Sequence, residues 1–573
     1  MLKRHSLAII FALLVGFFYV MPQLAFQVSL GDKFQGVYRV VNDDELYYMA
    51  RAREVVDGHY FISNPYFAEY KNGLPMQVFL PDLISAMPAK VLNIRIYPLY
   101  EFYDFLLPAL LFFLTYLIFY VLIKDRFWSL FLSGWIFLIK YFFMFNRPIS
   151  PQFVFIFAVT LILLLIKIIK NSEAKNNLLI FLAAVNFGFL FHIYPYLWTY
   201  FSTVLVLLII YYLWQKNFYL FKKFLIIFIS GIIIGLPYFY QTWRAGKAEF
   251  FQDTMARLGM IYTRFPSGIW IVIPSLILLA LLVYLYLKNR QNPSSYDLKA
   301  FFTVAILSAI INVNQHIITG KNFFFSSHYE IIAYLLVVFA LAYILWSSEK
   351  IAFLMKMRFI KVLALIIIIV NFIPIFNKIY DFDFNEAVKI QQWQLAFDWL
   401  NRNTKKDEVV MANDEISNYL PSYTHNNVLF NVNGKLFFMS TEEILDRFAL
   451  NNFWQKDFSN DFVKLKILSV YGYRNKALAG RAKQKNKIAK IFNFPQKPLD
   501  DLYYPPEQIK TILDYFKNIK EADWLNGLKK YQVKFLVLDN NQDGLLLKNI
   551  SKYGFMQSVF LNNNVSIYKV NNF

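Results

Sequence analysis

The feature that most constrains the fold of this chain is a series of long apolar runs, almost free of charge, between Leu7 and Phe376. An α-helix needs about 20 mostly apolar residues to cross a bilayer, and eleven segments meet that requirement. They begin near Leu7, Phe102, Phe127, Phe153, Leu178, Leu197, Phe224, Ile269, Phe301, Ile331 and Phe359. The sequence therefore predicts a polytopic α-helical membrane protein with about 11 spanning helices.

The composition changes beyond Phe376. Hydrophobic residues make up 58% of the whole chain, above the roughly 45–50% of soluble domains, and the excess lies before this point. In the second part, helical spacing places Trp393, Phe397 and Leu400 on one face, and 407–413 and 534–539 are typical of buried strands. Residues 558–570 predict a hairpin with its turn at 562–564. We expect a membrane domain over 1–376 and a C-terminal soluble α/β domain over 377–573.

The first apolar segment follows the basic residues Lys3 and Arg4, a pattern that fits either a cleaved signal peptide or a retained helix. Its apolar run extends to Phe26 and no clear small-residue cleavage site follows, which favours a retained helix.

The basic residues set the orientation, since cytoplasmic loops of membrane proteins are rich in Lys and Arg. With the N-terminus in the cytoplasm, alternate loops are all basic: Lys124 and Arg126; Lys167, Lys170 and Lys175; Lys216, Lys222 and Lys223; Lys288, Arg290 and Lys299; Lys350, Lys356 and Arg358. An odd number of helices then puts the first loop, 28–100, and the C-terminal domain together outside the cytoplasm. These loops account for much of the net charge of +20, and no nucleic-acid partner is expected.

One outer loop, 241–266, departs from this pattern with Arg244, Lys247, Arg257 and Arg264. Its charge suggests contact with an anionic ligand such as a phosphate. An amphipathic surface segment touching anionic lipids explains the charge equally well.

The first loop carries the acids Asp43, Asp44 and Glu45 at the start of a helix expected over 45–56, which Asp57-Gly58 ends. Leu46, Met49, Arg53 and Val56 lie at helical spacing, so this helix is expected to lie along the membrane surface. Acids at a helix start often only cap its free amides. A carboxylate close to the bilayer can also act as general base on a hydroxyl that attacks there.

The motif DELYYMARAREVVDG, 44–58, together with NPYFAEYKNG, 64–73, resembles the first outer loop of the GT-C superfamily of membrane glycosyltransferases. By this resemblance Asp44 falls on the catalytic acidic position, Glu45 lies beside it, and Asp43 is the alternative by one register. A second stretch, 312–330, resembles a segment of bacterial GT-C-like proteins. In it Lys321 and His328 could meet a phosphate, although polarity at a helix end explains them as well. Arg147, in a turn between two helices, is a further candidate for the phosphate.

The resemblance implies a glycosyltransferase, multi-pass in the plasma or inner membrane. It would move a sugar, hexosyl or related, from a polyprenyl-phosphate donor in the bilayer to an acceptor glycan, lipid or protein at the outer face, with inversion. The alternatives are a transporter or flippase of lipid-linked sugars, a surface-polysaccharide polymerase or ligase, and a non-catalytic scaffold. The sequence shows no clear internal repeat, and Lys140 is the main charge noted within the spans.

The chain has no cysteine, and its histidines lack a close ligand spacing, so no metal ligands are assigned. A divalent cation is possible only by the resemblance. No glycine fingerprint for nucleotide binding is found in the C-terminal domain.

Overall fold

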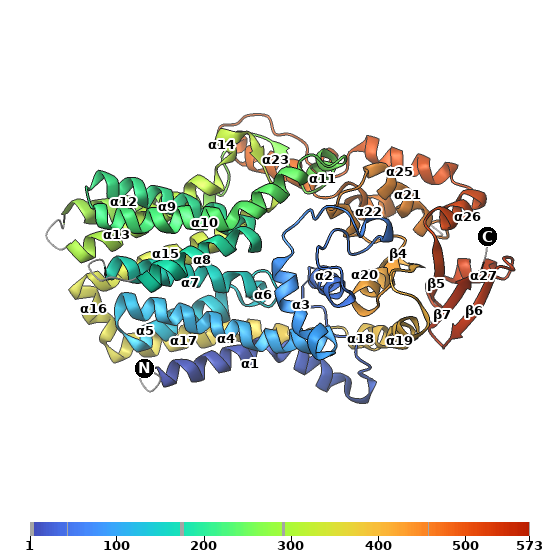
Figure 1. Cartoon of the computed structure of the whole chain (residues 1–573), viewed down its shortest axis with the longest axis horizontal. Helices are drawn as coiled ribbons and strands as arrows, with labels where there is room; N and C mark the ends of the chain where they lie inside the picture. The colour runs from blue at the N-terminus through green and yellow to red at the C-terminus, as the bar shows by residue number, and fades with distance from the viewer. Residues whose placement is uncertain (1–4, 43, 172–176, 289–292, 456–457, 572–573) are drawn as a thin grey trace.

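The structure, a computed structural model, describes residues 5–571 except 43, 172–176, 289–292 and 456–457. A bundle of long helices lies beside a C-terminal domain of shorter helices around a sheet, and the first loop lies between the two (Figure 1).

Eight helices of the described residues are long and apolar enough to cross a membrane. They are α1 (Ser6–Leu30), α4 (Ile96–Ile123), α7 (Gln152–Lys170), α9 (Pro195–Trp214), α10 (Phe218–Ala245), α13 (Pro293–Val313), α15 (His328–Ser347) and α17 (Arg358–Ile379). Two further apolar helices are α8 (Asn177–Ile193) and α12 (Ile269–Lys288), and the apolar stretch counted in α12 is the shorter Ile269–Leu285. The chain is therefore a multi-pass membrane protein.

The remaining predicted span is interrupted. It forms α5 (Arg126–Gly134), a π-helical stretch (Trp135–Lys140) and α6 (Phe142–Phe145). All eleven predicted segments are thus helical, but only eight meet the length and hydropathy of a full span without interruption. Short elements connect them: α11 (Phe251–Arg257), α14 (His316–Thr319), α16 (Glu349–Lys356), and the strands β1 (Ile261–Tyr262) and β2 (Lys321–Asn322).

Glycines allow two helix pairs in the bundle to pack closely. A Cβ at Gly16 of α1 would lie 2.3 Å from the carbonyl oxygen of Phe105 in α4. A Cβ at Gly231 of α10 would lie 2.1 Å from the ring of Phe187 in α8. Small residues at such contacts let helices approach in a membrane, where packing rather than the hydrophobic effect drives association.

The first loop contains α2 (Glu45–Asp57) and α3 (Leu80–Leu92), and Gly58 ends α2 in a left-handed conformation with φ +99°. The predicted helix and its stop are confirmed. Its predicted place on the membrane surface is wrong, because α2 lies between α3 and α20 (Asp414–Tyr423) of the C-terminal domain (Figure 1). Its polar residues Arg51 and Glu54 are buried there, paired with Asp82 and Lys71 from the same loop.

The C-terminal domain is built on a five-stranded sheet in the order β4-β3-β5-β7-β6. Strands β3 (Val409–Ala412), β4 (Asn427–Val428) and β5 (Val533–Asp539) are parallel, and β6 (Met556–Leu561) and β7 (Val565–Val570) form an antiparallel hairpin at one edge. The predicted strands and hairpin are confirmed, as is the apolar face of α19 (Trp393–Asn403). The other helices are α18 (Phe384–Gln391), α21 (Thr441–Asn451), α22 (Asn460–Tyr471), α23 (Arg474–Ile491), α24 (Asp500–Tyr503), α25 (Pro506–Asn518), α26 (Glu521–Lys530) and α27 (Gly544–Ile550).

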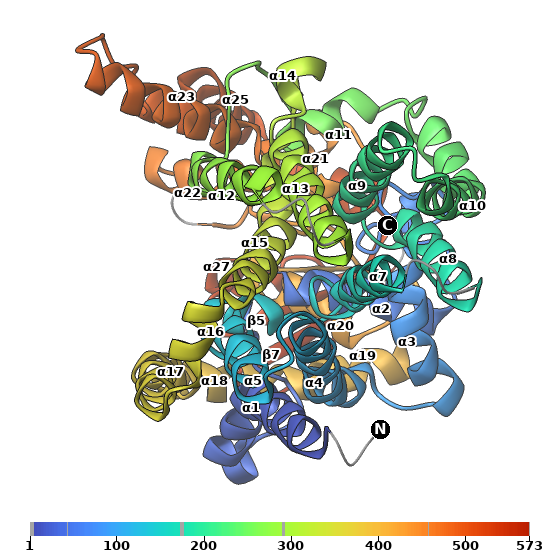
Figure 2. The ribbon, with the colours of Figure 1, turned by 90° about the vertical axis from the view of Figure 1, so that its left-hand side faces the viewer.

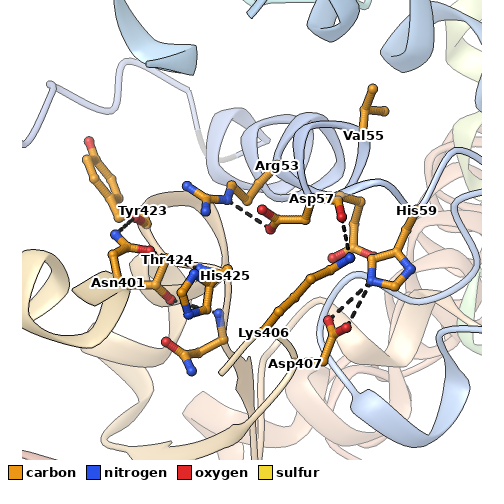
Figure 3. Close-up of polar contacts among 12 residues, drawn as sticks. Arg53, Val55, Asp57, His59, Asn401, Lys406, Asp407, Tyr423, Thr424 and His425 are labelled. Atoms are coloured by element: carbon orange, nitrogen blue, oxygen red, sulfur yellow. Dashed lines mark hydrogen bonds and ion pairs between the residues drawn. The ribbon is translucent and has the colours of Figure 1, made fainter. Parts of the chain in front are cut away.

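The first loop and the C-terminal domain share one hydrophobic core. Val37, Tyr47 and Phe67 of the loop are buried together with Phe397 and Val410 of the domain. Polar contacts close the same junction: His59 Nε2 lies 3.0 Å from Asp407 Oδ2, and Lys406 donates to the carbonyl of Asp57 (Figure 3). The two hydrophilic parts therefore lie at the same end of the bundle, as expected from the sequence.

Candidate functional site

Asp44 lies directly before α2 and forms an ion pair with Arg147. It occupies the N-cap position, but its side chain makes no capping hydrogen bond. The Asp44 side chain is 52% exposed and that of Arg147 is 16% exposed. In this structure the Asp44 carboxylate therefore pairs with a cation that is 103 residues away in the sequence, and it stays open to solvent instead of capping its own helix.

The segment around Arg147 connects α6 to α7 and is fixed against the first loop. Arg147 Nε donates to the carbonyl of Ser150 at 2.7 Å. Asn42 Nδ2 donates to the carbonyls of Phe143 and Asn146, at 3.2 and 2.5 Å. These bonds tie the backbone just before Asp44 to the same turn that presents Arg147.

Two tyrosines and a histidine complete the group. Ser150 interacts by hydrogen bonding with the side chains of Tyr48, in α2, and Tyr194, between α8 and α9. The Tyr194 hydroxyl contacts Nδ1 of His328 at the start of α15, and their rings stack at 5.8 Å. Burial is the main cause that raises the pKa of Tyr48, so its hydroxyl keeps its proton at neutral pH.

Glu45 points the other way, into the protein. It is 8% exposed, and its carboxyl accepts a hydrogen bond from the amide of Val41 at 2.8 Å. Burial raises the pKa of Glu45 to about 7, against the opposing effect of the Val41 and Asn42 amides and of Arg39. Glu45 thus holds the turn before α2 and changes its charge near neutral pH.

One acid within a span was not predicted as a site residue. Asp104 of α4 is 5% exposed and accepts a hydrogen bond at 2.6 Å from Nε2 of Gln152, the first residue of α7. Glu45 lies near enough to interact with it electrostatically. The signal was present, because an acid in an apolar run is costly unless it is partnered or functional. Lys140, noted instead, lies with Nζ 5.2 Å from the ring centre of Tyr334.

The structure divides the residues predicted to bind a donor phosphate. Only Arg147 and His328 lie in the group around Asp44, which we call the Asp44 cluster: Asp44, Tyr48, Arg147, Ser150, Tyr194 and His328. Asp43, the alternative in register, lies outside the described residues.

The other five candidate cations have different neighbours in the described part of the chain. Arg244 and Lys247 are exposed beside aromatic rings of α10. Arg264 donates to the carbonyl of Ile317 at 2.9 Å, and Lys321 is exposed in β2. Arg257 is 2% exposed and donates to the carbonyls of the C-terminal domain at Lys435, Phe437 and Met439, so it joins α11 to that domain.

The candidate residues described above do not by themselves form a metal site. Within the described residues no group of three or more His, Asp or Glu side chains could hold a metal ion. The divalent cation suggested by the resemblance stays a prediction, and no step below passes through it.

Comparison with known proteins gives structural neighbours of low sequence identity. No protein-family profile matches the chain, and no curated protein matches it in sequence. Among solved structures, ArnT from Cupriavidus metallidurans bound to undecaprenyl phosphate is similar over 99% of this chain and 98% of its own, with 10% identity and a TM-score of 0.43. The archaeal oligosaccharyltransferase AglB from Archaeoglobus fulgidus, in complex with an inhibitory peptide and a dolichol-phosphate, is similar over 100% of this chain and 75% of its own, with 12% identity and a TM-score of 0.41.

Likeness this distant carries no weight for the activity, which has to be argued from the chain's own residues.

Proposed function

We propose that this protein is a membrane glycosyltransferase that moves a sugar from a polyprenyl-phosphate donor to an acceptor hydroxyl, with inversion. The observation that supports this most is the half-exposed Asp44 carboxylate, paired with Arg147. Asp44 directly precedes α2, the helix that packs against α4 of the bundle, α3 of the first loop and α20 of the C-terminal domain. A base and an anion-binding group are thus held together at the end of apolar helices, where the head of a bilayer lipid can reach them.

The residues of the Asp44 cluster then have distinct roles. The acceptor oxygen forms a bond to the anomeric carbon, Asp44 takes the acceptor proton, and the bond from that carbon to the phosphate oxygen breaks. Polyprenyl phosphate leaves with the bonding electrons. The guanidinium of Arg147 and the protonated hydroxyl of Tyr48 offer donors for the charge on the leaving phosphate.

The ion pair between Asp44 and Arg147 implies an order of steps, in which the donor binds before Asp44 acts. While Arg147 is bound to Asp44, the guanidinium occupies the carboxylate oxygen that would face the acceptor. A donor phosphate competes for Arg147, because guanidinium binds phosphate well in bidentate geometry. Binding of the donor would therefore free Asp44 at the moment when the acceptor needs a base.

The test is the substitution Asp44→Asn, with Asp32→Asn as the control. Asp32 is an exposed acid of the same loop. Membranes carrying each variant receive polyprenyl phosphate linked to a radiolabelled sugar, and the label that leaves the lipid is measured. We expect Asp44→Asn to lower transfer by about 10²–10⁴-fold with unchanged membrane insertion, and Asp32→Asn to act as the parent protein. Full transfer by Asp44→Asn would reject Asp44 as the base. Label that crosses the membrane but stays on lipid would instead favour a flippase.

A further inference from the structure

The C-terminal domain carries one strongly basic arm, formed by α23 and the stretch after it, 474–497. Its eight charged residues are all basic: Arg474, Lys476, Arg481, Lys483, Lys485, Lys487, Lys490 and Lys497. No ion pair within the described residues involves any of them. The fold therefore leaves this charge without acidic partners, although acids are common elsewhere on the domain.

The tip of the arm is apolar and exposed. Ile491, Phe492 and Phe494 are 75%, 63% and 64% exposed, and the two phenylalanine rings stack at 6.1 Å. Two hydrogen bonds between Asn486 and Lys497, at 2.7 and 2.9 Å, fold the stretch back on α23 and hold the tip. Large apolar side chains held out in this way next to lysines are typical of segments that enter a membrane interface.

The base of the arm is fixed where a membrane helix begins. Arg481 Nη1 donates to the carbonyls of Phe265 and Pro266, at 2.9 and 3.0 Å. Lys487 Nζ lies 5.9 Å from the ring centre of Trp270, in the first turn of α12, and Trp270 is 84% exposed. Tryptophan at the start of an apolar helix is typical of the bilayer interface.

The direction of the arm takes it away from the bundle. Seen along the bundle, α23 projects sideways beyond the outline of the long helices (Figure 2). In this view the far end of α23 overlaps no other element that the structure describes.

We propose that the 474–497 arm binds the surface of the surrounding bilayer, with its lysines on anionic lipid headgroups and its apolar tip inserted between them. The charge is complementary to anionic lipid, and the exposed Ile491, Phe492 and Phe494 fit the apolar boundary below the headgroups. This role is independent of sugar transfer. It would fix the C-terminal domain, and with it α20 against α2, at a set height above the membrane.

The absence of cysteine in the chain makes a clean experiment possible. The full-length protein carrying Phe494→Cys is labelled with an environment-sensitive fluorophore and placed in nanodiscs of neutral phosphatidylcholine or of phosphatidylcholine with phosphatidylglycerol. Asn563→Cys, in the turn between β6 and β7, is the control site. We expect a blue shift and quenching by lipid-borne quenchers at 494 in the anionic discs, reversed by high salt, and no change at 563.

Charge variants complete the test. Lys483→Gln, Lys485→Gln, Lys487→Gln and Lys490→Gln together should weaken insertion, by about fivefold for each lysine lost near the surface. Four exposed lysines at 517, 529, 534 and 548, changed to Gln in the same way, should leave it unchanged. A label at 494 that stays in water in anionic discs overturns the proposal. The proposal is also overturned if the label at 494 shifts to the blue only when an anionic polysaccharide is added, because that result would identify a glycan as the partner.

Discussion

The position of α2 depends on a buried ion pair, and Asp82→Asn tests how strongly. Arg51 in α2 and Asp82 in α3 are each 2% exposed in their side chains, and two hydrogen bonds join them, at 3.0 and 2.6 Å. Arg51 also donates to the carbonyl of Val78 at 2.7 Å. Burial opposes the charge on Arg51, but Asp82 and Tyr47 outweigh it, so the pKa of Arg51 lies above its usual value.

The expected cost follows from this burial. Removing one partner of a buried pair leaves the other charge without compensation and costs about 3–5 kcal/mol. Asp57→Asn is the matched control on the same helix, because its pair with Arg53 is an i,i+4 contact at 2.9 Å whose side chains are 22% and 12% exposed. Such partly exposed helical pairs contribute only about 0.3–0.5 kcal/mol.

Hydrogen exchange read by mass spectrometry measures the difference locally. For Asp82→Asn we expect the amides of α2 to exchange roughly a hundredfold faster or more, since about 3 kcal/mol of local opening free energy is lost. For Asp57→Asn the change should stay within about threefold. Transfer should fall with Asp82→Asn, because α2 carries Tyr48 and follows Asp44 directly. Unchanged exchange in α2 of the Asp82 variant would show that the hydrophobic core, and not this pair, holds the helix.

Two further predictions concern Glu45 and Arg257. Burial raises the pKa of Glu45 from 4.5 to about 7. The stability that the protonated carboxyl contributes to the fold is therefore complete below about pH 4.5. This contribution, about 3 kcal/mol, is lost as the pH rises through 7. Thermal unfolding across pH 5–8 should show this loss, and Glu45→Gln should abolish that part of the slope. Arg257→Met removes the guanidinium donors to the carbonyls of Lys435, Phe437 and Met439, of which Phe437 keeps a hydrogen bond from Thr254. Exchange in 434–441 should therefore rise while the KM for the donor lipid stays constant. A large rise in that KM would instead support the phosphate role predicted for Arg257.

Much of the fold could be predicted because its signals are local. Apolar runs identify helices in a bilayer, Gly58 ends α2, and 562–564 mark the hairpin. The break within 126–145 was not predicted, since the run is apolar apart from a few residues such as Lys140 and the π-helical stretch depends on packing. The environment of α2 was also missed, because Arg51 and Glu54 are typical of a solvent-exposed face unless Asp82 and Lys71 are known to meet them.

The candidate site could be predicted only in parts. Asp44 and Arg147 were each singled out, but they are 103 residues apart and no pattern in the sequence joins them. His328 was also singled out, but its partner Tyr194 was not, and the two are separated by 134 residues. Arg257 was predicted as a phosphate ligand from its basic loop, and nothing in the sequence indicates that its donors reach main-chain carbonyls of a distant domain.

The surroundings of Asp44, Glu45 and Asp104 decide which of these three acids can act as the general base. A carboxylate inside a protein is costly unless donors satisfy it, and Asp104, at 5% exposure, has one amide donor while Glu45 has a pKa of about 7. Neither faces solvent, so neither can accept a proton from an acceptor that arrives from water. Asp44 alone among these three is half-exposed and beside a guanidinium that an incoming phosphate can draw away. If sugar is transferred at this end of the bundle, we therefore expect Asp44 to be the base and Glu45 to set the turn that presents it.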